Sequence, residues 1–229
     1  MNIVVFDTET TGIPLRPKPG EPPIFSSDPR QPRILQFAAV KYTGTHDAPV
    51  EVSRIDALIK PDGWEMPPEI VAFNEKHNTG ITMERLHAEG RPMLQVLDEF
   101  RAMFDDAEVI VAHNNSFDIK MVRIELTKNG HEGEVAVNWR DDNRHFCTMK
   151  ESTPICQIPA SNTRWGPYKS PKLAEAYLHF MGKPMEGEHQ GIKDAIAAAE
   201  IYFKLCGAGC GTPKPKPVKA ETSTETIGF

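Results

Sequence analysis

The sequence predicts an α/β domain in which helices cover the faces of a mixed sheet. Three short apolar runs with strand character come first, at residues 2–6, 34–42 and 53–59. Beyond them, segments with apolar residues at helical spacing alternate with one further apolar run, residues 108–112. An initial group of strands followed by strand–helix units is typical of a mixed sheet with helices packed on it.

Five helices are expected along the chain. In the clearest of them, apolar residues from Met93 to Phe104 recur at the three- and four-residue spacing of a helix face. Gly130 follows another such segment and marks its end. Residues 13–33 are rich in proline and are expected to form an irregular loop. The expected helices span residues 68–77, 93–104, 116–129, 173–181 and 192–205.

Size and composition indicate one domain with a tail. The chain has 229 residues, of which 39% are hydrophobic, and this is enough for one substantial core. We expect a domain over residues 1–206. Residues 207–229 are rich in Pro, Lys and Thr and lack an apolar period, so we expect a flexible tail there.

Charge and cysteine content narrow the functional class. No run of about 18 apolar residues occurs, and the Asp-x-Glu pair near the start is unlike a secretory signal, so a cytoplasmic protein is expected. The net charge of −6 argues against a long non-specific footprint on nucleic acid, although acidic residues that hold cations become locally positive. Free thiols are expected at Cys147, Cys156, Cys206 and Cys210.

Two carboxylates at the end of the first strand suggest a metal site. Asp7 and Glu9 are two residues apart, so strand alternation directs both to one side. Like charges held that close repel each other unless a cation lies between them, and a divalent cation with oxygen ligands is the usual solution. Alone, such a pair is more typical of a solvated strand end. Two further motifs, residues 113–118 and 189–195, change that interpretation.

The spacing within these motifs constrains the site. His189 and Asp194 would point about 140° apart on one helix, so they can share a site only if His189 lies in a loop before the helix of Asp194. Asp118 is expected in the first turn of its helix, where the macrodipole favours a carboxylate, with simple capping as the alternative role. His113 is expected to be structural rather than catalytic.

Three motifs in order carry a family resemblance. They are Asp-x-Glu-Thr-Thr-Gly at residues 7–12, His-Asn-x-x-Phe-Asp at 113–118 and His-x-x-x-x-Asp-Ala at 189–195. Over roughly residues 1–205 the chain resembles the DnaQ-like 3′–5′ exonucleases, the superfamily of polymerase proofreading subunits, in the branch called DEDDh. The resemblance implies an RNase H-like fold with a mixed five-stranded sheet. Gly191 is a departure, because the family commonly has alanine there.

The resemblance also implies roles for the motif residues. Two Mg²⁺ or Mn²⁺ ions would be held by Asp7, Glu9, Asp118 and Asp194. Asp7 would bridge both ions, Glu9 and Asp194 would hold the one that activates water, and Asp118 would complete the sphere of the other. His189 would take the proton from the nucleophilic water. The product would be a 5′-nucleoside monophosphate released from a 3′ end.

Several residues are expected to contact the nucleic acid. The family holds the terminal nucleotide at the backbone of Thr10, Thr11 and Gly12, and Thr79 precedes Gly80-Ile81-Thr82, which matches a segment close to substrate. Phe117 belongs to the second motif. Trp165 and Tyr168 are interleaved with cations, a composition that suits stacking on an unpaired end, although Trp165 could equally cover core.

Three questions stay open at this level. DNA is favoured as substrate over RNA because no RNA-binding module is appended, and a catalytically silent nucleic-acid-binding module is disfavoured because all four acids and the histidine are present. The terminal Ile227-Gly228-Phe229 could dock on a polymerase or clamp, or the tail could be a solvated end.

Overall fold

A five-stranded mixed sheet forms the centre of the protein. The computed structural model describes residues 1–131, 143–162, 164 and 166–209. The strands are β1 (Ile3–Thr10), β2 (Ile34–Gly44), β3 (Pro49–Leu58), β4 (Val109–Ala112) and β5 (His145–Cys147), in the order β3-β2-β1-β4-β5. β1 pairs antiparallel with β2 and parallel with β4. The predicted fold class is therefore confirmed.

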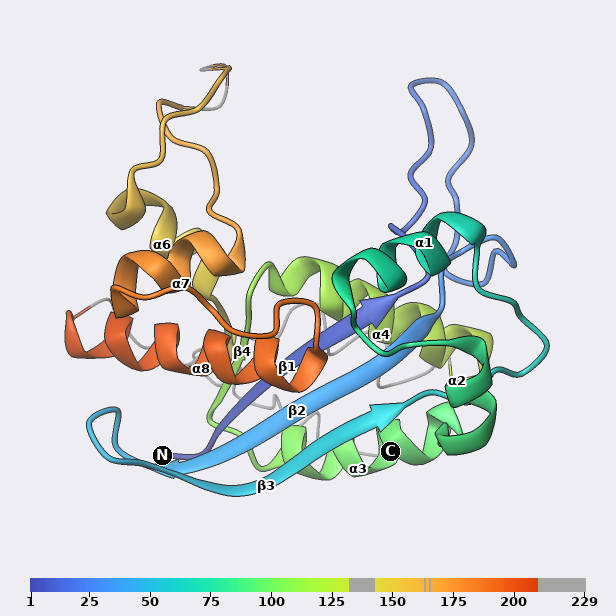
Figure 1. Cartoon of the computed structure of the whole chain (residues 1–229), viewed down its shortest axis with the longest axis horizontal. Coiled ribbons are helices and arrows are strands. Elements are labelled where there is room, and N and C mark those ends of the chain that lie inside the picture. The colour runs from blue at the N-terminus through green and yellow to red at the C-terminus, as the bar shows by residue number, and fades with distance from the viewer. Residues whose placement is uncertain (132–142, 163, 165, 210–229) are drawn as a thin grey trace, which may run out of the picture.

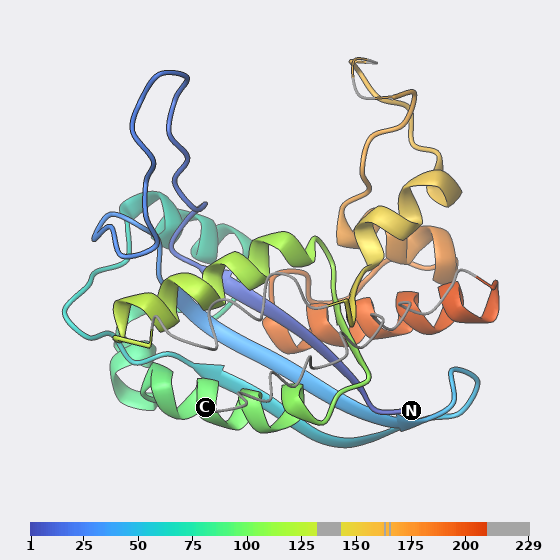
Figure 2. The same ribbon diagram turned by 180° about the vertical axis from the view of Figure 1, so that it is seen from behind.

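Helices cover both faces of the sheet. α3 (Met93–Asp105) and α4 (Asn115–Lys128) lie on one face, in front of the strands in Figure 2. α7 (Leu173–Met181) and α8 (Gly191–Gly207) lie on the other, in front in Figure 1, with α6 (Thr148–Cys156) beside them. Successive side chains of β1 point to opposite faces of the sheet. Val4 and Phe6 pack with α3 and α4, whereas Ile3 and Val5 pack with α8. Because of this alternation, Asp7 and Glu9 lie on the α8 side.

The remaining elements border the end of β1. α1 (Pro68–His77) and α2 (Met83–Glu89) follow β3, and Thr82 caps α2 by accepting a hydrogen bond from the backbone N–H of Arg85 at 3.2 Å. The loop between β1 and β2 and the chain between α6 and α7 both project from the same end of the molecule (Figures 1 and 2). The first of these is the irregular loop predicted for residues 13–33.

All the predicted elements are present, most with bounds within two residues of the prediction, but β1 extends to Thr10 rather than Phe6, so Asp7 and Glu9 lie within the strand. α1 and α7 coincide with the predicted ranges, whereas β3 begins at Pro49 rather than residue 53. The prediction missed α2, α6 and the three-residue β5, as discussed below. Cys147, Cys156 and Cys206 are not in disulfides among the described residues, as expected, and Cys210 lies outside those residues. None of the described helices is long and apolar enough to cross a membrane.

Candidate metal and active site

The third motif joins a loop to the start of a helix. α8 begins at Gly191, so His189 lies in the preceding loop and Asp194 in the first turn, the arrangement that their spacing requires. The backbone N–H of His189 donates to Oδ2 of Asp194 at 3.1 Å. α8 packs across β1 and β2, which brings Asp194 to the carboxylates of β1. Ligand atoms of Glu9, His189 and Asp194 all lie within 4.8 Å of one another.

Close packing at Gly191 brings the start of α8 against β2. The buried Gly191 N–H donates to Oε1 of Gln36 at 3.2 Å, and an added Cβ would lie 3.3 Å from both Ala38 Cβ and that Oε1. An alanine at this position would therefore need its neighbours to shift by a few tenths of an ångström. This close approach explains how glycine fits where the resembling family commonly has alanine.

Asp118 joins the cluster from the opposite side of β1. It is buried in the first turn of α4, as expected, and its Oδ1 accepts from the Thr8 N–H at 3.1 Å and the Thr8 hydroxyl at 2.8 Å. His113, just before this helix, contacts Thr148 Oγ1 and the Pro171 carbonyl at 3.0 Å through its two ring nitrogens. His113 thus joins the start of α6 to the chain just before α7, in keeping with the structural role expected for it.

The clustered carboxylates raise one another's pKa. Burial raises the pKa of Asp7 well above its usual value, and the charges of Asp118, Asp194 and Glu9 add to this. Burial also raises the pKa of Glu9 to about 7 and that of Asp118 to about 7, and burial together with the Glu9 charge raises that of Asp194 to about 8. Oδ1 of Asp194 is buried without a hydrogen-bond partner among the described residues. An unpartnered carboxylate oxygen in a repelling cluster of acids fits a hard divalent cation.

His189 is held under the end of α1. Its backbone has φ of 64°, a left-handed conformation that is uncommon for a residue with a side chain. Its ring packs edge-on against Phe73, with centroids 5.0 Å apart, and against His77, with centroids 4.8 Å apart. Burial and the charge of His77 lower the pKa of His189, so its imidazole is neutral and can accept a proton near neutral pH. The sequence reasoning missed Phe73 and His77.

The residues predicted to contact nucleic acid lie in several parts of the chain. Thr10 is the last residue of β1 and Thr11 and Gly12 follow it; the Thr10 hydroxyl donates to the Gly12 carbonyl at 2.8 Å. The Thr79 hydroxyl is hydrogen-bonded within its own segment, because it donates to Asn74 Oδ1 at 3.1 Å and accepts from the Ile81 N–H.

The remaining contacts come from two other places. Phe117 is partly buried against the α3–α4 core. Tyr168 is 38% exposed on the chain that projects between α6 and α7, and Trp165 lies outside the described residues. Ile13, which the sequence reasoning also missed, is 78% exposed immediately after Gly12.

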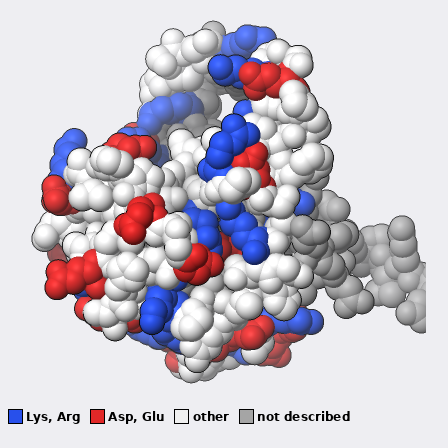
Figure 3. Space-filling model, turned by 90° about the vertical axis from the view of Figure 1, so that its right-hand side faces the viewer, with Lys and Arg blue, Asp and Glu red and all other residues white. Residues whose placement is uncertain are grey.

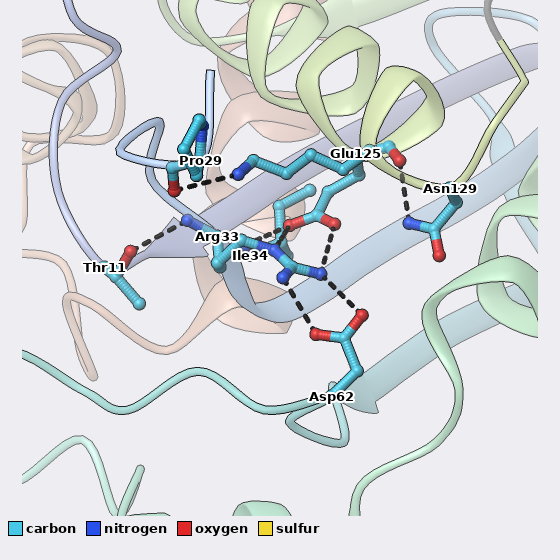
Figure 4. Close-up of polar contacts among 8 residues, drawn as sticks. Thr11, Pro29, Arg33, Ile34, Asp62, Glu125 and Asn129 are labelled. Atoms are coloured by element: carbon cyan, nitrogen blue, oxygen red, sulfur yellow. Dashed lines mark hydrogen bonds and ion pairs between the residues drawn. The ribbon is translucent and has the colours of Figure 1, made fainter. Parts of the chain in front are cut away.

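A buried ion pair fastens the Thr11 segment to α4 (Figure 4). The Arg33 guanidinium donates to both carboxylate oxygens of Glu125, at 3.0 and 3.1 Å, and also to Asp62 at 2.8 Å. Arg33 and Thr11 are joined twice, through Arg33 N–H to Thr11 Oγ1 at 2.8 Å and Thr11 N–H to the Arg33 carbonyl at 2.9 Å. The helix that carries Asp118 thereby also positions the turn after Glu9.

Comparison with known proteins identifies the family. The sequence model of the family described as Exonuclease (RNase_T) matches residues 4–202. This chain belongs to that exonuclease family. The resemblance to DnaQ-like exonucleases is confirmed by curated relatives of this exonuclease domain. Among them is the DNA polymerase III subunit epsilon of Aquifex aeolicus, 27% identical over 88% of this chain and 79% of the relative.

Other relatives are much longer than this exonuclease chain. The DNA polymerase III subunit epsilon-like protein of Rhodobacter capsulatus is 29% identical over 91% of this chain. The PolC-type DNA polymerase III of Thermotoga maritima is 32% identical over 88% of it. The chain spans only 24% and 12% of these two proteins.

Solved structures share the fold. E. coli exonuclease I in complex with a dA16 oligonucleotide has a TM-score of 0.60 and 19% identity, covering 90% of this chain and 41% of that one. The nuclease domain of 3′hExo, a DEDDh family member bound to rAMP, has a TM-score of 0.60 and 17% identity, covering 92% and 94%. At these sequence identities, the structural similarity supports the fold of the exonuclease and nothing more specific.

Proposed function

We propose that this chain is a metal-dependent 3′–5′ exonuclease that hydrolyses phosphodiester bonds at single-stranded or frayed DNA 3′ ends and releases 5′-nucleoside monophosphates. The observation that carries the proposal is the convergence of Asp7, Glu9, Asp118, Asp194 and His189 from β1, α4 and the start of α8. Membership of the exonuclease family supports the same reaction.

The acids would hold two Mg²⁺ or Mn²⁺ ions. Asp7 has carboxylate neighbours on both sides, which suits a ligand shared between two ions, and the unpartnered Oδ1 of Asp194 offers a further ligand atom. When bound, such ions polarise the scissile phosphate and stabilise charge on the attacking and leaving oxygens. The chain supplies their ligands from three separate elements, so the site exists only in the folded domain.

His189 would act as the general base. Its neutral imidazole is held beside Asp194 by the short loop and by the rings of α1, and it can accept the proton of an attacking water. The backbone turn at Thr10–Gly12 would hold the terminal nucleotide, and exposed Ile13 would pack against a base. Phe117 and Tyr168 remain candidates for further base contacts.

DNA is favoured over RNA as substrate. The relatives that match most of this chain are named as subunits of DNA polymerase III, and this also supports a polymerase as a partner. One structural neighbour was solved with rAMP, so an exoribonuclease is the second candidate. A silent binding module is disfavoured because the complete acid set is retained in one cluster. The tail could dock on a polymerase or clamp, and a cytoplasmic location stays our expectation.

A single assay tests the proposal. Purified protein with Mg²⁺ is given 5′-labelled single-stranded DNA, blunt duplex, mismatched-end duplex and RNA of equal length. We expect a ladder that shortens from the 3′ end, fastest on single-stranded or frayed DNA, and no ladder in excess EDTA. Full activity in EDTA or shortening from the 5′ end would contradict the mechanism, and faster cleavage of RNA would select the exoribonuclease.

A further inference from the structure

Three cations gather where α4 meets the loop between β1 and β2. Lys120 and Arg123 are one helical turn apart, so they lie on the same side of α4. Nζ of Lys120 donates to the carbonyl of Leu15 at 3.3 Å, which places the next residue, exposed Arg16, beside the helix. The three residues Arg16, Lys120 and Arg123 are called the basic trio below.

No carboxylate among the described residues forms an ion pair with a member of the basic trio, in contrast to several arginines elsewhere. Arg30, Arg33, Arg54 and Arg85 each pair with a carboxylate. On the face in Figure 3, Lys and Arg gather on the projecting loop and in the middle of the surface below it, interspersed with Asp and Glu. Within the described part of the chain, the basic trio is therefore a local group of three cations that forms no ion pair with a carboxylate.

The arrangement of the trio has an electrostatic cost. Nε of Arg123 is buried and has no hydrogen-bond partner among the described residues, and an unsatisfied buried donor is destabilising. The charges of Arg16 and Arg123 both act on the Lys120 ammonium, so the three side chains lie near one another. An anion with several oxygens would both neutralise the three charges and accept from their donors.

We propose that the basic trio binds the phosphodiester backbone of the nucleic-acid strand whose 3′ end occupies the metal site, and so holds the strand beyond the nucleotide that is removed. This inference rests on the proposed function. Asp118, Lys120 and Arg123 share α4, but Lys120 and Arg123 project from a different side of the helix than Asp118. Lys120 contacts Leu15, three residues beyond Gly12, so a strand that leaves the turn at Thr10–Gly12 along this loop meets the trio.

The trio is suited to a single strand. Three contacts give modest affinity, which is compatible with the net charge of −6 and with a strand that must advance after each cleavage. The Lys120 contact to Leu15 makes the loop and α4 two walls of one site, whereas a duplex footprint would need a longer row of cations.

The test measures strand binding without turnover. A labelled single DNA strand of about 12 nucleotides is titrated in EDTA by fluorescence anisotropy at several salt concentrations. The test variant is Lys120→Gln/Arg123→Gln. The matched control is Arg101→Gln/Lys204→Gln, which removes the same charge from α3 and α8, where Arg101 already pairs with Asp105. A labelled oligoglutamate of equal charge is titrated in parallel.

The proposal predicts a change in salt dependence. Losing two phosphate contacts should reduce the slope of log Kd against log salt by about 1.4, so the ratio of variant to wild-type Kd should fall about sevenfold between about 50 and about 200 mM salt. The control should keep the wild-type slope. Equal slopes for test variant and control would overturn the inference, as would oligoglutamate binding that is as tight as the strand and equally sensitive to the substitutions.

The binding test is separate from the exonuclease assay. If the strand binds through the trio and no 3′ shortening occurs with Mg²⁺, the proposed function fails and the binding site stands. If the 3′ end is shortened normally and the double variant binds like the control, the trio inference fails and the proposed function stands. Circular dichroism of each variant establishes that its fold is intact.

Discussion

The backbone N–H of His189 donates a hydrogen bond to Asp194 Oδ2 at 3.1 Å, so the proposed base and a proposed metal ligand form one unit at the start of α8. The backbone of His189 is left-handed, and the other carboxylate oxygen of Asp194 has no hydrogen-bond partner among the described residues. Five residues of sequence thereby connect proton transfer to metal binding.

Without metal, the stability of the protein should fall as pH rises from about 4 to about 8. The raised pKa values of Glu9, Asp118 and Asp194, about 7, 7 and 8, mean that the folded state binds more protons than the unfolded chain in this window. Stability is therefore greatest below the unfolded pKa of the acids and decreases as they ionise. Thermal unfolding in EDTA across this range measures the trend.

Divalent metal should remove most of this pH dependence. Mg²⁺ or Mn²⁺ binds the ionised cluster of the folded state, so it should raise the melting temperature most at the alkaline end of the window. A melting temperature that is independent of metal at pH 8 would contradict a metal site at these acids.

Replacing Asp7 by alanine should abolish exonuclease activity while the fold survives. Asp7 is the acid on which the charges of the other three all act, so its removal takes away the proposed shared ligand and relieves like-charge repulsion. We expect activity at background and, in EDTA, a melting temperature at or above that of the wild type. A folded variant that cleaves at a rate comparable with the wild type would mean that Asp7 is not the shared ligand.

Replacing Arg33 by methionine should destabilise the fold by about 3–5 kcal/mol, because it leaves the Glu125 carboxylate buried without its partner. The double variant Arg33→Met/Glu125→Met should recover much of the loss, since it removes both charges. Chemical denaturation of the two variants measures both effects. A single variant as stable as the wild type would show that solvent reaches Glu125.

Local sequence patterns predicted most of the fold because its long helices and strands have clear apolar patterns. α3 and α8 have apolar faces that one window of sequence reveals, and β4 is wholly apolar. The missed elements have no such signal. α2 has seven residues with only Leu86 buried, β5 has three residues, and α6 contains Pro154, which favours a loop in any local interpretation.

At the candidate site, too, local sequence patterns predicted only part of the arrangement. The motifs named the acids and His189. Strand and helix geometry related Asp7 to Glu9 and His189 to Asp194, and the family resemblance joined these pairs and Asp118 into one site. Long-range packing alone decides the rest. Arg33 reaches Glu125 across 92 positions of sequence, and the ring of His77 meets that of His189 across 112, separations at which no periodicity links two residues.

Replacing His77 by alanine should lower activity by mispositioning His189, by less than the roughly 10²-fold expected for loss of the base itself. His77→Phe keeps an aromatic ring against His189 and should restore the rate, whereas His77→Ala should not. Both variants remove the charge that lowers the His189 pKa, so in both the acid limb of the rate profile should move to higher pH. Rate–pH profiles measure the two effects separately. An unchanged rate and profile in His77→Ala would exclude the positioning role.

Replacing His189 by alanine tests the base directly. We expect a loss of about 10²–10⁴-fold in kcat, the usual contribution of positioned proton transfer. The wild-type rate should be fully developed above the His189 pKa, which burial and His77 hold below its usual range, and should be lost as pH falls through it. The variant should lack this limb, and its deficit should shrink at high pH, where hydroxide replaces the base. Strand affinity in EDTA should be unaltered, since the ring is assigned to proton transfer rather than to holding the strand. A variant with the wild-type rate and the wild-type acid limb would make His189 a loop residue and place the base elsewhere in this nuclease fold.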